Sequence, residues 1–125
     1  METALRSPSA ALEAASLDEP HEVRRFPRGH MEVVRVCGHA VARVTFAPGW
    51  RWSADVRPAA GTRSCEVTHT GVVLAGRLAV RMDDGIEAVA GPGDVVRVPP
   101  GHDGWVVGDD ACVMLDWTGA DDYAR

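Results

Sequence analysis

From Val23 onward, short apolar runs rich in valine alternate with glycine, proline and aspartate. β-Branched residues suit the pleated, half-buried surface of a strand, and the interrupting residues are typical of tight turns. The pattern predicts an extended segment that begins with residues 50–52 and a loop over 57–62. It predicts no helix in the interior of the domain. The remaining strands are expected over residues 32–36, 41–46, 64–68, 72–75, 78–82, 86–90, 95–98, 105–107 and 111–117.

The strongest local turn signal is Asp83-Asp84-Gly85, which separates two apolar runs. Glycine accepts the positive φ of a tight hairpin, so we expect an antiparallel pair on either side of it. Regularly spaced short strands without helical crossovers favour a β-sandwich or β-barrel over a parallel α/β fold. The predicted fold class is therefore all-β, with the strands closed into a barrel.

The length of 125 residues fits one domain. Residues 1–20 are rich in alanine, serine and glutamate and have no firm apolar stripe, so we expect a flexible tail there. Residues 21–125 would then form the single barrel domain.

Charge and cysteine content narrow the classes of function. The chain has 13 basic residues, all of them arginine, against 18 acidic residues, which gives a net charge of −5. Such a chain lacks the basic patch that nucleic-acid binding requires. No apolar run is long enough for a membrane span or shaped like a secretory leader, and Cys37, Cys65 and Cys112 form no CxxC pair. We therefore expect a cytoplasmic protein with reduced thiols, and the arginine-only composition favours a bacterial source.

Two blocks of the sequence resemble the cupin superfamily. The run from His69 to Leu78, HTGVVLAGRL, is similar to the end of cupin motif 1, in which a glutamate precedes a glycine by seven residues. The run from Gly93 to Gly101, GDVVRVPPG, is similar to the start of motif 2. The resemblance implies a double-stranded β-helix, the cupin jelly-roll barrel, with an internal ligand cavity.

The usual cupin metal ligands are two histidines separated by one residue, a glutamate and a distant histidine. The resemblance places these four slots on Arg63, Cys65, His69 and Gly104, with His102 two residues before the last slot. The usual ligand set is therefore absent. Cys65, His69 and His102 form an alternative set, because thiolate and imidazole suit Zn²⁺ and also Fe or Cu.

Other residues are candidates for parts of the same site. A carboxylate from Asp103 or Asp116 could complete the ligand set. The alternative is simple packing for Cys65, a cavity histidine bonded to a neighbour for His69, and a solvent-exposed position for His102. Arg63, Trp52 and Trp105 are candidates for a substrate pocket, Arg63 because guanidinium pairs with carboxylates. The tryptophans could equally fill the core or a dimer interface. If residue 104 faces inward as in metal cupins, Trp105 faces outward.

Three functions are compatible with these residues. The first is a metal-dependent enzyme acting on a small organic molecule, and the second is a metal-free domain that binds or senses a small ligand. The third is metal-free catalysis with His69 as general base. We also expect a homodimer, because a small barrel has exposed strand edges and the segment from Trp50 to Trp52 could pair across a two-fold axis.

Overall fold

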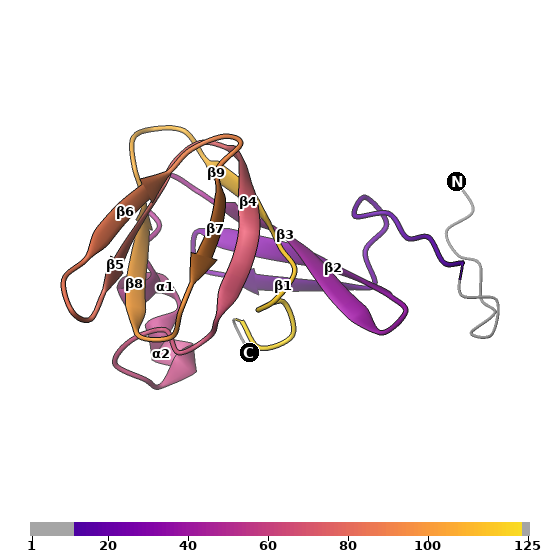
Figure 1. Ribbon diagram of the computed structural model, residues 1–125, viewed down its shortest axis with the longest axis horizontal. Helices are drawn as coiled ribbons and strands as arrows, with labels where there is room; N and C mark the ends of the chain where they lie inside the picture. Colours follow the sequence, from indigo (N-terminus) through magenta and orange to yellow (C-terminus); the bar gives the residue numbers. More distant parts are fainter. Residues whose placement is uncertain (1–11, 124–125) are drawn as a thin grey trace.

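The structure is a computed structural model that describes residues 12–123 (Figure 1). Two antiparallel sheets form its body, one with the strand order β1-β2-β3-β9-β4-β7 and one with the order β6-β5-β8. Two single-turn helices, α1 and α2, lie between β3 and β4. The strands are β1 (Glu22–Phe26), β2 (Gly29–Val36), β3 (His39–Phe46), β4 (His69–Ala75), β5 (Leu78–Met82), β6 (Glu87–Ala90), β7 (Val95–Val98), β8 (His102–Val106) and β9 (Cys112–Asp116).

The alternation of side chains along the strands builds the interior. In β9, Cys112, Met114 and Asp116 are buried, while the residues between them are partly exposed. β8 follows the same rule, with His102 and Gly104 turned inward. Successive side chains of a strand point to opposite faces, so each strand contributes every second residue to the space between the sheets.

The structure confirms the all-β prediction and the main hairpin. The runs 78–82 and 95–98 are strands with the expected bounds. Gly85 has a φ of 92°, and its N–H donates to the carbonyl of Met82 at 2.9 Å, as a tight turn between β5 and β6 requires.

The prediction that the domain has no interior helix was wrong. Residues Trp52–Asp55 form α1 and residues Arg57–Ala60 form α2, in place of the expected extended piece and loop. Each helix is one turn long, which is too short to leave a helical period in the sequence. Local interactions stabilise them instead. In α1 the carboxylate of Asp55 accepts from the N–H of Arg51 at 3.0 Å, and in α2 Pro58 lies in the first turn, where proline is favoured.

Two strand predictions were also corrected. The run 64–68 is no strand, and within it only Cys65 makes a β-bridge, to His102. β1 was not expected, because the charged residues of EVRRF hide its alternation. Its Arg24 is buried and donates to the carbonyls of Ala120 and Tyr123, both at 2.7 Å.

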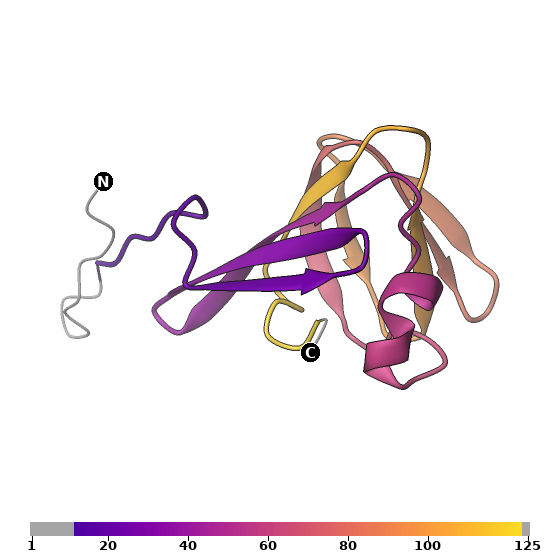
Figure 2. The ribbon, with the colours of Figure 1, turned by 180° about the vertical axis from the view of Figure 1, so that it is seen from behind.

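Residues 12–20 contain neither helix nor strand and lead away from the barrel (Figures 1 and 2). Asp18 forms an ion pair with Arg43 at 3.0 Å, on the surface of the larger sheet. Residues 1–11 and 124–125 lie outside the described part, and so does most of the predicted tail. Among the described residues, no helix is long and apolar enough to cross a membrane.

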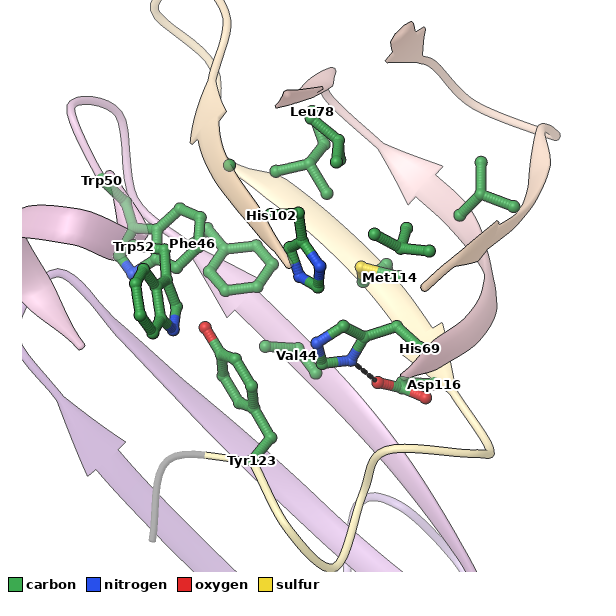
Figure 3. Close-up of a pocket in the computed structure, with 14 residues that line it drawn as sticks. Val44, Phe46, Trp50, Trp52, His69, Leu78, His102, Met114, Asp116 and Tyr123 are labelled. Carbon is green, nitrogen blue, oxygen red and sulfur yellow. Dashed lines mark hydrogen bonds and ion pairs between the residues drawn. The ribbon is translucent and has the colours of Figure 1, made fainter. Parts of the chain in front are cut away.

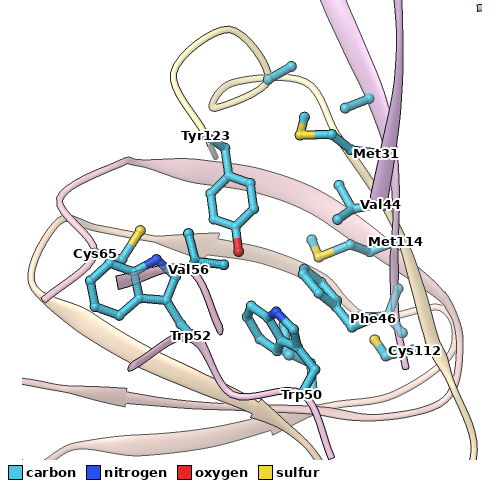
Figure 4. Packing of buried hydrophobic residues seen from close by; sticks show 14 of the residues in the cluster. Met31, Val44, Phe46, Trp50, Trp52, Val56, Cys65, Cys112, Met114 and Tyr123 are labelled. Atoms are coloured by element: carbon cyan, nitrogen blue, oxygen red, sulfur yellow. The ribbon is translucent and has the colours of Figure 1, made fainter. Parts of the chain in front are cut away.

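Aliphatic side chains fill the core together with aromatic and sulfur-containing ones (Figure 4). Trp50 and Trp52 are only 3% and 2% exposed, and the ring of Trp50 lies 4.0 Å from that of Phe46. The two tryptophans are therefore packed inside their own chain. The expected pairing of this segment with a second copy stays a prediction, and such a contact would involve its exposed residue Arg51 rather than the two indoles.

Candidate metal centre

Cys65, His69 and His102 meet in the interior of the barrel. One ligand atom from each, the Cys65 Sγ atom and a ring nitrogen of each histidine, lies within 4.8 Å of the others. The centres of the two imidazole rings are 5.4 Å apart, and the ring planes make an angle of 71° (Figure 3). The sequence proposed these three residues as ligands, and the fold brings them together.

Backbone pairing fixes the relative positions of the three residues. The N–H of Cys65 donates to the carbonyl of His102 at 2.8 Å, and the N–H of Gly101 donates to the carbonyl of Cys65 at 2.8 Å. His69 is the first residue of β4 and lies opposite Val98 of β7. The centre therefore lies at the end of the barrel where β4 of the larger sheet approaches β8 of the smaller one.

Both imidazoles are oriented by a hydrogen bond at Nδ1. The His69 Nδ1–H donates to the Asp116 carboxylate at 2.6 Å, and the His102 Nδ1–H donates to the carbonyl of Pro99 at 2.7 Å. With Nδ1 engaged in this way, Nε2 is the remaining ring atom, and the His69 Nε2 atom lies 3.6 Å from the Cys65 Sγ atom. Histidines that bind metals are usually held in this manner, with the second ring nitrogen bonded to a carboxylate or a carbonyl.

The electrostatics of the cluster favour a thiolate beside an imidazolium when no ion is bound. Burial opposes ionisation of Cys65, but hydrogen bonds from His102 and His69 outweigh it and lower the thiol pKa to about 6. Burial likewise opposes the charged form of His69, yet its hydrogen bonds to Asp116 and Cys65 raise the pKa to about 9. The pKa of Asp116 stays below its ordinary value despite burial, because His69 and two backbone N–H groups stabilise the carboxylate.

Asp116 and Asp103, the two candidate carboxylate ligands, have other partners. The second oxygen of Asp116 accepts from the N–H groups of Thr118 and Gly119 at 3.0 and 2.9 Å. Asp103 accepts from the N–H of Ser53 at 3.0 Å, on the partly exposed side of β8. Asp116 therefore orients a candidate ligand, and Asp103 supports α1.

A small, mostly apolar cavity of about 50 Å³ adjoins the cluster (Figure 3). Its walls include Phe46, Trp52, Leu78 and Met114, and His69 and His102 form its polar end. Gly104 also lines the cavity. The slot in which metal cupins carry their distant histidine therefore holds no side chain here.

The three candidate pocket residues fall in different places. Trp52 lines the cavity, while Arg63 is exposed in the loop after α2 and lies outside it. Trp105 is not among the lining residues either, because it follows the inward-facing Gly104 on the strand. The Cζ atom of Arg51 lies over its indole, 4.4 Å from the ring centre. Because residue 104 faces inward, Trp105 faces outward, as the alternation of side chains along a strand predicts.

One polar lining residue, Tyr123, was not assigned to the pocket from the sequence. Tyr123 is the only tyrosine of the chain and lies in the turn that follows β9, far from either cupin-like block. Its ring packs edge-on against His69, with centres 5.2 Å apart. No local pattern marks it, because its place depends on the long-range contacts of Arg24 with this turn.

Comparison with known proteins identifies the fold. No family model and no curated protein sequence matches the chain. A sugar phosphate isomerase from a cupin superfamily of Silicibacter pomeroyi is 23% identical, with a TM-score of 0.58 over 81% of this chain and 71% of that one. A putative ethanolamine utilization protein Q from Salmonella typhimurium is 16% identical, with a TM-score of 0.59 over 94% of both chains. The comparison confirms the predicted cupin jelly-roll fold.

Proposed function

We propose that this chain, which has the cupin fold, is a metal-dependent enzyme acting on a small organic molecule. The Cys65 Sγ atom and the Nε2 atoms of His69 and His102 would hold one transition-metal ion. The observation that carries this proposal is that a separate acceptor holds each Nδ1 atom, which leaves both Nε2 atoms and the thiol for one ion.

The donor set fits Zn²⁺ best, and it also suits Fe²⁺ and Cu. Thiolate and imidazole are the ordinary ligands of zinc, and three protein ligands with an open fourth position are typical of catalytic rather than structural zinc sites. His69 and His102 line the apolar cavity, so a molecule bound there would lie next to an ion held by these residues. An ion bound here would supply Lewis-acid activation of an oxygen atom, and the apolar walls would exclude bulk water from it.

A metal-free binding domain is the second candidate. The observation that favours it is the 3.6 Å contact between the Cys65 Sγ atom and the His69 Nε2 atom, because a thiolate and an imidazolium at these positions would satisfy the cluster without an ion. The same pair disfavours metal-free catalysis by His69 as a general base. With a pKa of about 9, its imidazole is already protonated at neutral pH.

Elemental analysis of purified and reconstituted protein tests the main proposal. We expect about one equivalent of a transition metal in the wild-type chain and in a Cys112→Ala control, and far less in Cys65→Ala. Cys112 is a matched control because it is also buried but lies outside the cluster. Less than about a tenth of an equivalent in the wild type after reconstitution would favour the binding domain instead.

We further propose that the chain forms a homodimer through the edges β6 and β7. These strands end the two sheets, and the exposed apolar residues Ile86, Val89 and Val95 lie on or beside them. Apolar side chains at an unpaired strand edge invite pairing with another chain. Light scattering at micromolar concentration is expected to give twice the mass of the chain, and Val95→Lys is expected to lower it to the monomer mass.

A further inference from the structure

Two buried polar atoms of the cavity lining have no hydrogen-bond partner within the described chain. They are Nε1 of Trp50 and the hydroxyl Oη of Tyr123. The two residues are only 3% and 5% exposed, so bulk water does not compensate the missing bonds. Buried polar groups are nearly always paired, and an unpaired one inside a cavity indicates a ligand that completes it.

Both groups are held rigidly in place. The main chain of Tyr123 is anchored by the buried Arg24, and its ring packs against His69 and Phe26 with centres 5.2 and 5.9 Å apart. The indole of Trp50 lies against the ring of Phe46. The Tyr123 hydroxyl points toward the space between the two buried indoles (Figure 4). Such fixed groups orient a ligand without a loss of their own conformational freedom.

The charge of the lining restricts the ligand further. No arginine among residues 12–123 lines the cavity, and the only titratable lining residues of this range other than Tyr123 are His69, His102 and Asp116. These three belong to the metal cluster or to its hydrogen bonds. A carboxylate away from the cluster would therefore be buried without a cationic partner, which is unfavourable. A neutral oxygen has no such penalty.

We propose that the cavity binds a small uncharged molecule whose carbonyl or amide oxygen accepts hydrogen bonds from Tyr123 Oη and Trp50 Nε1. The remainder of the molecule is apolar and contacts Leu78, Val80 and Met114. A cavity of about 50 Å³ accommodates roughly three to five non-hydrogen atoms, at about 10–15 Å³ for each water-sized group. This substrate class deepens the proposed function, but the two donors bind the oxygen whether or not an ion is present.

Nuclear magnetic resonance of chelator-treated protein tests the proposal independently of the metal. The chain has four tryptophans, so its nitrogen–proton spectrum shows four indole signals, and Trp50→Phe assigns one of them. Acetamide is the neutral probe, acetate its charged counterpart and 2-methylpropene an apolar molecule of similar size. We expect acetamide to move the Trp50 signal saturably and acetate to bind at least about tenfold more weakly. The Trp105 indole, outside the cavity, serves as the internal control.

Tyr123→Phe removes one donor and leaves the ring packing intact. We expect about fivefold weaker acetamide binding, unchanged 2-methylpropene binding and an undiminished melting temperature. A hydroxyl with a structural role would instead lower the melting temperature and affect both probes. Equal affinity of the variant and the wild type for acetamide, equal binding of acetate and acetamide, or no saturable shift up to about 100 mM acetamide would each overturn the proposal. The proposed metal-dependent function is tested separately by metal content. Failure of the ligand proposal can therefore be distinguished from failure of the proposed function.

Discussion

The Nδ1 atom of His69 lies 2.6 Å from one oxygen of Asp116, whose other oxygen caps the turn that leads to Tyr123. A single carboxylate therefore orients a candidate ligand and shapes the segment that carries a pocket donor. Because Asp116 is buried and ends β9, its position is set by the core of the barrel. This arrangement makes the candidate metal centre and the cavity parts of one structural unit.

Replacement of Asp116 by asparagine should weaken metal binding by about 10- to 100-fold. The Oδ1 atom of asparagine can still accept from Thr118 and Gly119, so the turn is kept. Its amide would, however, present N–H to the Nδ1 atom of His69. The imidazole would then carry its proton on Nε2, the atom that the ion requires. Competition with a chromophoric chelator measures the loss.

Asp110→Asn is the matched control, because Asp110 is exposed and lies outside the cluster. We expect its metal affinity to equal that of the wild type. If Asp116→Asn also kept the wild-type affinity, the hydrogen bond from His69 would have no role in holding the ligand.

Metal affinity should rise with pH in two stages. Since the pKa of His69 is about 9 and that of Cys65 about 6, an ion binding between these values displaces the proton of His69 but none from Cys65. The association constant should therefore rise about tenfold per pH unit over this range and level off above pH 9. Below pH 6 the dependence should be steeper, because Cys65 must lose a proton as well. Calorimetry in buffers of different ionisation enthalpy counts the released protons, and a flat affinity between pH 6 and 9 would contradict the thiolate–imidazolium pair.

Gly85→Val should lower the free energy of unfolding by roughly 1–3 kcal/mol. The φ of 92° at Gly85 disfavours a β-branched residue, and a Cβ there would contact nothing within 4 Å, so the cost is conformational rather than steric. Gly91→Ala is the control, since Gly91 has no positive φ and its Cβ would have ordinary contact with Arg77. Urea denaturation compares the two, and equal midpoints would mean that the turn tolerates a side chain.

The barrel could be predicted because most of its strands carry local signals. The β5–β6 hairpin is specified by Asp84-Gly85 between two apolar runs, and both turn and strands were found. The helices α1 and α2 were not predictable in the same way. Each is a single turn, which is too short to leave a helical period. α1 is stabilised by Asp55, which accepts from the side chain of Arg28 and from the N–H of Arg51.

The site could be predicted only in part, for a related reason. Cys65 and His69 fall on ligand positions that the resemblance to cupins implies, and His102 lies two residues before another, so the resemblance and the ligand chemistry of thiol and imidazole selected them together. The roles of Asp116 and Tyr123 depend on residues more than forty positions away in sequence, such as His69 and Arg24. Alternation along β8 predicts only that Gly104 and Trp105 face opposite ways. Which of them faces the interior is determined by the register between β8 and β5.

A chain starting at Pro20 should keep its melting temperature within about 5 °C of the full chain, which corresponds to roughly 1 kcal/mol for a domain of this size. Asp18, which the truncation removes, pairs with Arg43 but is 80% exposed, and such surface ion pairs contribute little. Arg43 keeps a second partner in Glu32 at 2.9 Å. A larger drop by calorimetry would show that residues 1–19 stabilise the barrel.

Alkylation of the three cysteines should distinguish a metal ligand from a packed thiol. Cys65 is 2% exposed, but its pKa of about 6 makes it a thiolate at neutral pH, so it reacts whenever local opening admits iodoacetamide. A bound ion would occupy the sulfur and suppress that reaction until a chelator removes it. Cys112 is buried as well, but burial raises its pKa to about 11, and it should stay unlabelled in both conditions. Mass spectrometry of each peptide gives the labelled fraction, with the exposed Cys37 expected to react in both.

His69→Ala completes this test, because a centre with three protein ligands loses most of its affinity when one is removed. In that variant Cys65 should be labelled to the same extent with and without the metal. Cys65 should also react more slowly at pH 7. Without the hydrogen bond from His69 its pKa moves upward, so a smaller fraction of it is thiolate. If wild-type Cys65 were labelled equally with and without chelator, and His69→Ala kept its metal content, the ion would have to bind elsewhere. The cluster would then act as a metal-free pair, and the binding-domain function would account better for the site.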